Sequence, residues 1–312
     1  MTTDTPHPIS ISTAWNAMKH TSGREMAAEL LGLGFDTLEL DVHVTRKMIQ
    51  EVREMVSDGE VRISSLHNYC PLPDGIPREI AGGDALMLSS PDPKARRRAV
   101  DNARTTVDWA AELGAKAVVL HLGRPYLIAD QRTALRLIEV GMTEQAVELI
   151  RLGLAERETI KQPHLDSVIE SVRDLADHAR GTGVRLGLET RYYCFEFPTC
   201  DELAVIFDAV DSPEVGYWHD TGHAYVQEIL GVATQRDFLS RYGDRLIGMH
   251  LHNGIDGSDH WPITRGEIGF EEIVRYVQDD TVLVLEIHKG DDTELVRSRE
   301  LMERLVADRG AS

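Results

Sequence analysis

The sequence predicts a mixed α/β fold, a single (βα)8 or TIM barrel. Short apolar runs alternate with helix-length amphipathic segments along the chain, and eight such pairs can be followed. Eight strand–helix units favour a closed barrel over an open, doubly wound sheet. At 312 residues, the chain is long enough for one large barrel domain spanning residues 1–312.

The expected strands are short, mainly apolar runs, which are typical of buried parallel strands. They cover residues 9–13, 37–42, 62–66, 117–121, 185–189, 215–219, 246–250 and 282–287. The segments between them space their apolar residues as a helix with one buried face does. They cover residues 24–33, 45–57, 93–113, 165–180, 200–209, 234–242, 270–278 and 293–307. Gly32 and Gly34 end the first helix and Gly181 and Gly183 the fourth, a common stop signal.

Two stretches exceed the connections that a minimal barrel needs. Residues 68–93 follow the third strand and are rich in proline and glycine. Residues 123–163 follow the fourth strand and contain two further helical segments, 132–140 and 143–159. Both insertions leave the carboxyl ends of their strands, the face where barrel enzymes carry their active sites. They are expected to form a lid or a contact in a homo-oligomer.

The bulk composition narrows the class of protein. A net charge of -19, from 33 basic and 52 acidic residues, disfavours unaided binding of nucleic acid. No apolar run approaches the roughly 18 residues of a membrane span, and the first ten residues lack a signal-peptide pattern. Cys70, Cys194 and Cys200 are scattered and form no paired framework, so we expect a reducing cytoplasm.

Charged or imidazole side chains close four apolar runs in the second half of the chain. They are Glu189, Asp220, His250 and Glu286. In a parallel barrel the carboxyl ends of the strands share one mouth, so residues distant in sequence can meet there. Three carboxylates and one imidazole suit Mn²⁺, Mg²⁺ or Co²⁺, and further imidazoles shift the preference toward Zn²⁺. The alternative is that each residue is a salt-bridged or solvated strand end.

More histidines lie close to these strand ends. His67 and His121 end the third and fourth strands, His223 follows Asp220 by three residues, and His260 lies further on. We treat these four as possible additional metal ligands. His252 lies two residues after His250, so both side chains would face the same side of a strand, and His252 is a candidate substrate-binding residue.

Candidate substrate-binding residues lie just past strand ends. Four cations could meet a phosphate or carboxylate, and five aromatic residues could stack on a sugar ring. The cations are Arg124, Arg191, Arg265 and Lys289, and the aromatic residues are Trp15, Tyr193, Phe195, Trp218 and Trp261. Trp218 is expected in the core and Trp261 in the pocket. The sequence has no P-loop, so no nucleotide cofactor is expected.

Several of these motifs together resemble the xylose isomerase-like barrel superfamily, which includes sugar isomerases and epimerases and class II AP endonucleases. The motifs are Gly187-Leu188-Glu189, Asp220-Thr221-Gly222-His223, His250-Leu251-His252-Asn253 and Leu285-Glu286. In the epimerase branch, the resemblance implies one divalent metal held by Glu189, Asp220, His250 and Glu286. It also implies that Glu189 and Glu286 act as an acid/base pair, with His223 orienting the substrate.

In the endonuclease branch, the resemblance implies three Zn²⁺ ions, with His67, His121, His223 and His260 among the ligands. The chain departs from both branches. Ile255, Asp256 and Gly257 stand where epimerases often carry an arginine, and Ser258 replaces an endonuclease aspartate that appears one place late as Asp259. Asn253 stands where endonucleases have a further aspartate.

We therefore expect a metal-dependent enzyme that isomerises or epimerises a small sugar, a sugar phosphate or a related hydroxy-carbonyl compound through a metal-bound enediolate. A zinc phosphodiesterase or AP endonuclease ranks second. A lyase or dehydratase on the same scaffold is the third alternative, and a binding barrel without catalysis is the fourth. The expected partner is a small-molecule substrate.

Overall fold

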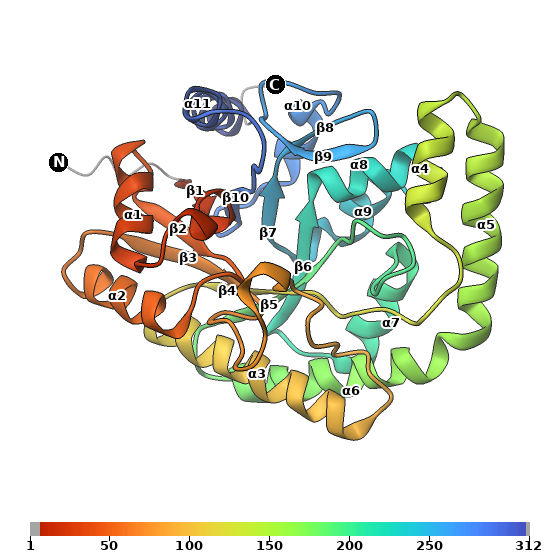
Figure 1. Cartoon of the computed structure of the whole chain (residues 1–312), viewed down its shortest axis with the longest axis horizontal. Coiled ribbons are helices and arrows are strands. Elements are labelled where there is room, and N and C mark those ends of the chain that lie inside the picture. The colour runs from red at the N-terminus through yellow and green to blue at the C-terminus, as the bar shows by residue number, and fades with distance from the viewer. Residues whose placement is uncertain (1–6, 310–312) are drawn as a thin grey trace.

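A computed structural model describes residues 7–309, in which eight parallel strands close into a barrel surrounded by helices (Figure 1). The strand order is β1-β10-β7-β6-β5-β4-β3-β2, and β1 pairs with both β2 and β10, which closes the sheet. The barrel strands are β1 Ile9–Ser12, β2 Thr37–Leu40, β3 Arg62–His67, β4 Ala117–Leu120, β5 Arg185–Glu189, β6 Val215–Asp220, β7 Leu246–Leu251 and β10 Val282–Leu285. The predicted barrel is confirmed.

Helices connect these strands and cover the outside of the barrel. They are α1 Gly23–Gly32, α2 Arg46–Ser57, α3 Pro93–Glu112, α4 Gln131–Glu139, α5 Thr143–Ile160, α6 Gln162–Ala179, α7 Cys200–Val210, α8 Thr221–Ile229, α9 Gln235–Tyr242, α10 Phe270–Ile273 and α11 Asp292–Asp308. Most begin at a capping side chain. Thr199, for example, accepts a bond from the backbone of Glu202, and the Glu202 side chain bonds back to the Thr199 backbone.

The structure differs from the prediction in three places. Helix α8 was not expected, and it starts directly after β6 because the Asp220 carboxylate accepts a bond from the His223 backbone N–H. The helix expected over 270–278 is a single turn followed by a 3-10 turn, Val274–Tyr276. A small antiparallel hairpin of β8 Asn253–Ile255 and β9 Ser258–Trp261 follows β7 and was also unexpected.

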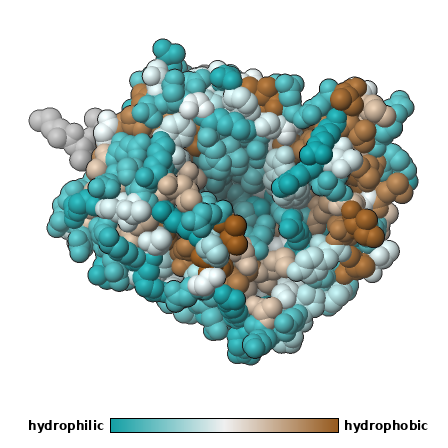
Figure 2. All heavy atoms as spheres, viewed as in Figure 1, coloured by the Kyte–Doolittle hydropathy of each residue, from teal (hydrophilic) through white to brown (hydrophobic). Residues whose placement is uncertain are grey.

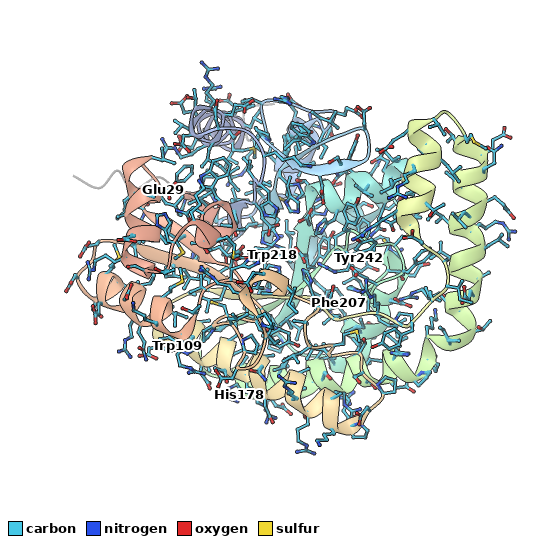
Figure 3. All side chains as sticks on the ribbon, viewed as in Figure 1. Glu29, Trp109, His178, Phe207, Trp218 and Tyr242 are labelled. Atoms are coloured by element: carbon cyan, nitrogen blue, oxygen red, sulfur yellow. The ribbon has the colours of Figure 1, made fainter. Side chains whose placement is uncertain are left out.

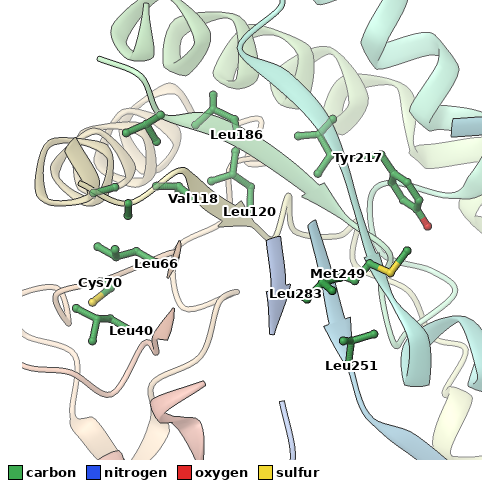
Figure 4. Close-up of a cluster of buried hydrophobic side chains, with 14 of the residues drawn as sticks. Leu40, Leu66, Cys70, Val118, Leu120, Leu186, Tyr217, Met249, Leu251 and Leu283 are labelled. Atoms are coloured by element: carbon green, nitrogen blue, oxygen red, sulfur yellow. The ribbon is translucent and has the colours of Figure 1, made fainter. Parts of the chain in front are cut away.

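The apolar core of the barrel has two layers, separated by the strands, and a further apolar cluster lies around α4, α5 and α8. The outer layer lies between strands and helices, and Figure 4 shows part of it, including Leu66, Leu120 and Leu283. The inner layer fills the barrel and consists of Ala117, Val119, Trp218, Ile247, Val282 and Val284. Trp218 is fully buried there, as expected, and lies near the centre of the view in Figure 3.

Glycines make room for the Trp218 ring inside the barrel. A Cβ atom at Gly248 would lie 2.1 Å from Trp218 Cζ3, and one at Gly187 would lie 2.9 Å from Cε3. Contacts this close do not occur between real atoms, so the neighbouring strands need glycine at these positions. Trp218 therefore forms a floor under the barrel mouth, where its ring meets the His250 ring edge-on at 5.2 Å between centroids.

The insertion after β4 forms an antiparallel pair of helices, α4 and α5, at the right-hand edge of Figure 1. Large apolar side chains gather on its surface, as the brown spheres in Figure 2 show. The exposed ones in this segment are Tyr126, Ile128, Val140, Met142, Val147 and Leu152. Among the described residues, no helix is long and apolar enough to cross a membrane.

Candidate metal centre at the barrel mouth

The four strand-end residues singled out in the sequence meet at the barrel mouth. Glu189, Asp220 and His250 lie on β5, β6 and β7, and Glu286 directly follows β10. One ligand atom from each lies within 4.8 Å of the others, and all four side chains are buried. The closest contacts are 2.7 Å from His250 Nδ1 to Glu189 Oε1 and 3.3 Å to Glu286 Oε2. Figure 2 shows a hollow lined with hydrophilic residues near the middle of this face.

The cluster of Glu189, Asp220, His250 and Glu286 holds three carboxylates but only one imidazole that could offset their negative charge. Burial, together with the carboxylates of Asp220 and Glu189, raises the pKa of Glu286 well above its usual range despite His250. Burial also acts against ionisation of Glu189, but His121 and Arg191 hold the pKa of Glu189 well below its usual range. Three buried carboxylates gathered around one imidazole are a donor set that fits a divalent cation.

His67 and His121 extend this cluster on the side of β3 and β4. Together with Glu189 they form a second group whose ligand atoms lie within 4.8 Å of one another. His121 Nε2 lies 2.8 Å from Glu189 Oε2. The His67 and His121 rings meet edge-on, with 4.6 Å between their centroids. Burial, together with the nearby His121, lowers the pKa of His67 to about 4, so this imidazole is neutral and able to coordinate.

His223 and His260 extend the metal-ligand cluster on the side opposite His67 and His121. His223 Nδ1 lies 2.9 Å from the Thr190 carbonyl oxygen, and His260 Nδ1 lies 2.8 Å from that of Glu286. A carbonyl only accepts, so both rings carry hydrogen on Nδ1 and leave Nε2 free. Asp259 Oδ2 lies 3.7 Å from His223 Nε2 and 3.5 Å from His260 Nε2. The carboxylate that appears one place late in the sequence therefore still reaches both imidazoles.

His252 has a different environment, although its ring nitrogens lie near those of His223 and His260. Its Nδ1 accepts a bond of 2.9 Å from the His260 backbone N–H, which places the ring hydrogen on Nε2. That Nε2 lies 3.0 Å from Asp220 Oδ1. Both ring nitrogens are thus occupied by protein partners, and His252 orients the Asp220 carboxylate.

Three further predicted substrate-binding residues, Arg191, Trp261 and Lys289, contact charged or polar groups of the protein. Arg191 is buried and contacts Glu189 directly, with Glu196 Oε2 at 3.2 Å and Asp84 Oδ2 at 3.5 Å. Trp261 is half-buried and lies near two cations, with the Arg265 guanidinium 4.4 Å and Lys289 Nζ 5.0 Å from the ring centroid. Lys289 Nζ also donates to Ser258 Oγ and to the Asp259 carbonyl, both at 2.6 Å.

Sequence reasoning missed three acidic residues beside the site: Glu39, Asp84 and Glu196. Glu39 is fully buried on β2 and contacts His250 Nε2 at 3.1 Å. Burial raises the pKa of Glu196 to about 7, although Arg191 opposes this shift. Glu39 could have been found as a lone carboxylate inside an apolar strand, whereas Asp84 and Glu196 lie in irregular loops that carry no periodic signal.

The loop after β5, which carries Arg191 and Glu196, is held by the α4–α5 insertion. The side chain of Gln131 on α4 donates to the Tyr192 carbonyl at 2.8 Å and accepts from the Cys194 N–H at 2.7 Å. Arg157 on α5 donates to the Phe195 carbonyl at 2.8 Å. We name these contacts the insertion clamp; both side chains are 1% exposed.

Arg157 is the costliest member of the insertion clamp to lose. Its guanidinium pairs with both oxygens of Glu202, at 2.6 and 2.8 Å, and Glu202 is itself buried. Arg157→Met should therefore lower the free energy of unfolding by about 3 kcal/mol, because it leaves the buried Glu202 carboxylate with only the Thr199 N–H at 3.0 Å and Lys161 Nζ at 3.5 Å. Urea unfolding measures this loss. The double variant Arg157→Met/Glu202→Leu should recover part of it, and a double variant no more stable than the single one would contradict this explanation.

A closed parallel barrel with buried carboxylates and imidazoles at its mouth is the arrangement of a TIM-barrel enzyme. The family model of the xylose isomerase-like TIM barrel matches residues 27–307, and the chain belongs to this family. Comparison with curated proteins found no match.

Solved structures resemble the whole chain at low sequence identity. A D-tagatose 3-epimerase-like protein is 19% identical with a TM-score of 0.69, over 97% of this chain and 98% of the other. An L-ribulose 3-epimerase is 16% identical with a TM-score of 0.68, over 98% and 96%. A Thermus thermophilus protein soaked with ZnCl2 is 22% identical with a TM-score of 0.58, over 96% and 98%. At these identities the resemblance establishes the shared fold.

Proposed function

We propose that this protein is a metal-dependent isomerase or epimerase acting on a small sugar, a sugar phosphate or a related hydroxy-carbonyl compound. The observation that carries the proposal is the convergence of Glu189, Asp220, His250 and Glu286, whose ligand atoms lie within 4.8 Å of one another at the barrel mouth. The epimerases among the structures of similar fold support the proposed substrate class.

The four residues would hold one Mn²⁺, Zn²⁺, Co²⁺ or Mg²⁺ ion. When bound, the metal supplies a Lewis acid that polarises a carbonyl and acidifies the neighbouring C–H bond. Glu189 and Glu286 approach the site from β5 and from the end of β10, strands that β6 and β7 separate in the barrel. One carboxylate removes the proton and the other returns it, on the opposite face or at the next carbon. His223, whose Nε2 is free, orients a substrate oxygen.

Metal affinity should rise with pH. Glu286 has a raised pKa, and so does His250, because Glu286 and Glu39 outweigh the effect of its burial. These directions favour protonated forms of the pair in the metal-free protein, and a cation must displace those protons. Acid therefore competes with the metal, and binding releases protons. Calorimetric titration in two buffers of different ionisation enthalpy measures the number released; binding without proton release at neutral pH would contradict the proposed ligand set.

The test of the function is an exchange experiment in D2O on protein of known metal content. Elemental mass spectrometry should find about one divalent metal per chain. A panel of ketoses and their phosphates, followed by NMR, should show deuterium entering at the carbon next to the carbonyl, and a chelator should abolish this. Loss of water from the substrate, seen as a mass change, would instead identify a lyase. No exchange on any substrate by the metal-loaded protein would reject the proposal.

A multinuclear zinc phosphodiesterase is the second candidate function. His223 Nε2, His260 Nε2 and Asp259 Oδ2 favour it because they face one another beside the first site, as do His67 and His121 on the other side. Two or three Zn²⁺ per chain, together with cleavage of a duplex containing an abasic site, would support this candidate. One metal per chain without cleavage would reject it.

We also propose a reducing, cytoplasmic setting and a homo-oligomeric state. Cys70, Cys194 and Cys200 are buried and unpaired, which suits a compartment where disulfides do not form. The apolar side chains on the α4–α5 surface are the support for a contact between copies. Light scattering of the purified protein measures the oligomeric state directly.

A further inference from the structure

Glu39 is a buried carboxylate that the proposed chemistry does not use. It lies on β2 and is 0% exposed. The pairing of β2 with β3 shifts register between Leu38 and Glu39, which sets Glu39 opposite Ser65. The Ser65 hydroxyl donates to Glu39 Oε2 at 2.8 Å, and Ser65 is also fully buried. A buried carboxylate is costly unless it is paired, so its second partner must carry a proton.

That second partner is His250. His250 Nε2 lies 3.1 Å from Glu39 Oε1 and 3.2 Å from Oε2. A carboxylate oxygen accepts hydrogen bonds, so this contact places a ring hydrogen on Nε2. The other nitrogen, Nδ1, faces Glu189 at 2.7 Å, Glu286 at 3.3 Å and Asp220 at 3.6 Å. Once a cation displaces the proton of Nδ1, the lone pair of this nitrogen is directed at the candidate metal centre.

We infer that Glu39, held in place by Ser65, is a positioning residue that fixes the tautomer and the ring orientation of His250 for metal binding through Nδ1. Metal-binding histidines commonly donate their second ring N–H to a carboxylate, which also makes the ligand a stronger donor. Glu39 approaches the ring from the Nε2 edge, whereas the other carboxylates approach Nδ1. It is therefore a partner of the histidine and not a fifth ligand. The inference rests on the metal centre of the proposed function.

Two variants test this role in the full-length protein. Glu39→Gln keeps the size of the side chain and removes its charge, and Ser65→Ala leaves the carboxylate but removes its support. The matched control is Ser171→Ala. Ser171 is also a buried serine, but its hydroxyl donates to the Leu88 carbonyl outside the site. If Glu39→Gln fails to fold, Ser65→Ala still tests the role of Glu39, because it removes the hydrogen bond that supports the carboxylate.

The first readout is the Zn²⁺ dissociation constant, measured against a competing chelator. Glu39→Gln should weaken binding about 10- to 100-fold, as loss of such an outer partner generally does. Ser65→Ala should weaken it less, and Ser171→Ala should leave it unchanged. The second readout is the ¹H–¹⁵N long-range NMR spectrum of the zinc-loaded protein with labelled histidine. The wild type should show the His250 proton on Nε2, and Glu39→Gln should let that proton exchange faster with water.

The outcomes separate this inference from the function on which it rests. Unchanged Zn²⁺ affinity in Glu39→Gln, with intact binding by the wild type, would overturn the role of Glu39 alone. A His250 proton on Nδ1 would overturn it as well. A wild-type protein that binds no divalent metal would overturn both the metal centre and the role of Glu39.

Discussion

Glu189→Gln should lower the turnover number about 10³-fold on a verified substrate, within the range reported for general acid or base residues. Glu189 is fully buried, and its oxygens contact His250 Nδ1, His121 Nε2 and Arg191. Glutamine preserves the shape of the side chain and one potential ligand oxygen but cannot take up a proton. Deuterium exchange at the substrate carbon should fall by the same factor as turnover.

Two measurements separate loss of the base from loss of the metal. The Zn²⁺ or Mn²⁺ affinity of the variant gives the contribution of ligation, and assays at saturating metal give that of proton transfer. Glu170→Gln is the control, because Glu170 lies on α6 and its side chain is 59% exposed. Full activity of Glu189→Gln at saturating metal would show that another group removes the proton.

Trp218→Ala should lower the free energy of unfolding by about 5 kcal/mol, at the upper end of the range for buried aromatic residues. The ring is fully enclosed in the inner layer of the barrel, so the surrounding strands cannot close the cavity. The loss should appear in the metal-free protein by urea unfolding. Because the ring lies against His250, metal binding should weaken as well.

The close approach of Gly248 to this ring provides an independent check. Gly248→Ala should destabilise the protein because the new methyl group would overlap the Trp218 ring. Adding Trp218→Phe should relieve the overlap. The double variant should therefore lose less free energy of unfolding than the sum of the losses in the two single variants. Gly32→Ala, where a Cβ atom meets nothing within 4 Å, should be neutral or stabilising. Additive effects at Gly248 and Trp218 would contradict the proposed fit.

The parts of the site that could be predicted from sequence are those governed by local pattern. An apolar run that ends in a charge marks a strand end, and parallel topology then brings Glu189, Asp220, His250 and Glu286 together. Helix α8 escaped prediction because Asp220 was interpreted only as a ligand, although the same carboxylate also caps the helix.

Other parts depend on contacts between distant segments. Asp84 and Glu196 reach the site from irregular loops, and their positions follow from ion pairs with Arg191. Glu39 depends on a register shift against β3, which no single strand encodes. The partners of Lys289 likewise lie on the β8–β9 hairpin, which the strand pattern did not indicate.

The insertion clamp has a consequence for engineering the loop after β5. Gln131 and Arg157 bond to backbone atoms of residues 192–195, so the shape of that loop is imposed by helices that precede it by more than thirty positions. A loop grafted from a relative would lose these supports unless α4 and α5 were transferred with it. The smallest exchangeable cassette is therefore residues 123–198 with the intervening strand. Libraries that vary the two segments jointly should yield more folded variants than libraries that vary the loop alone.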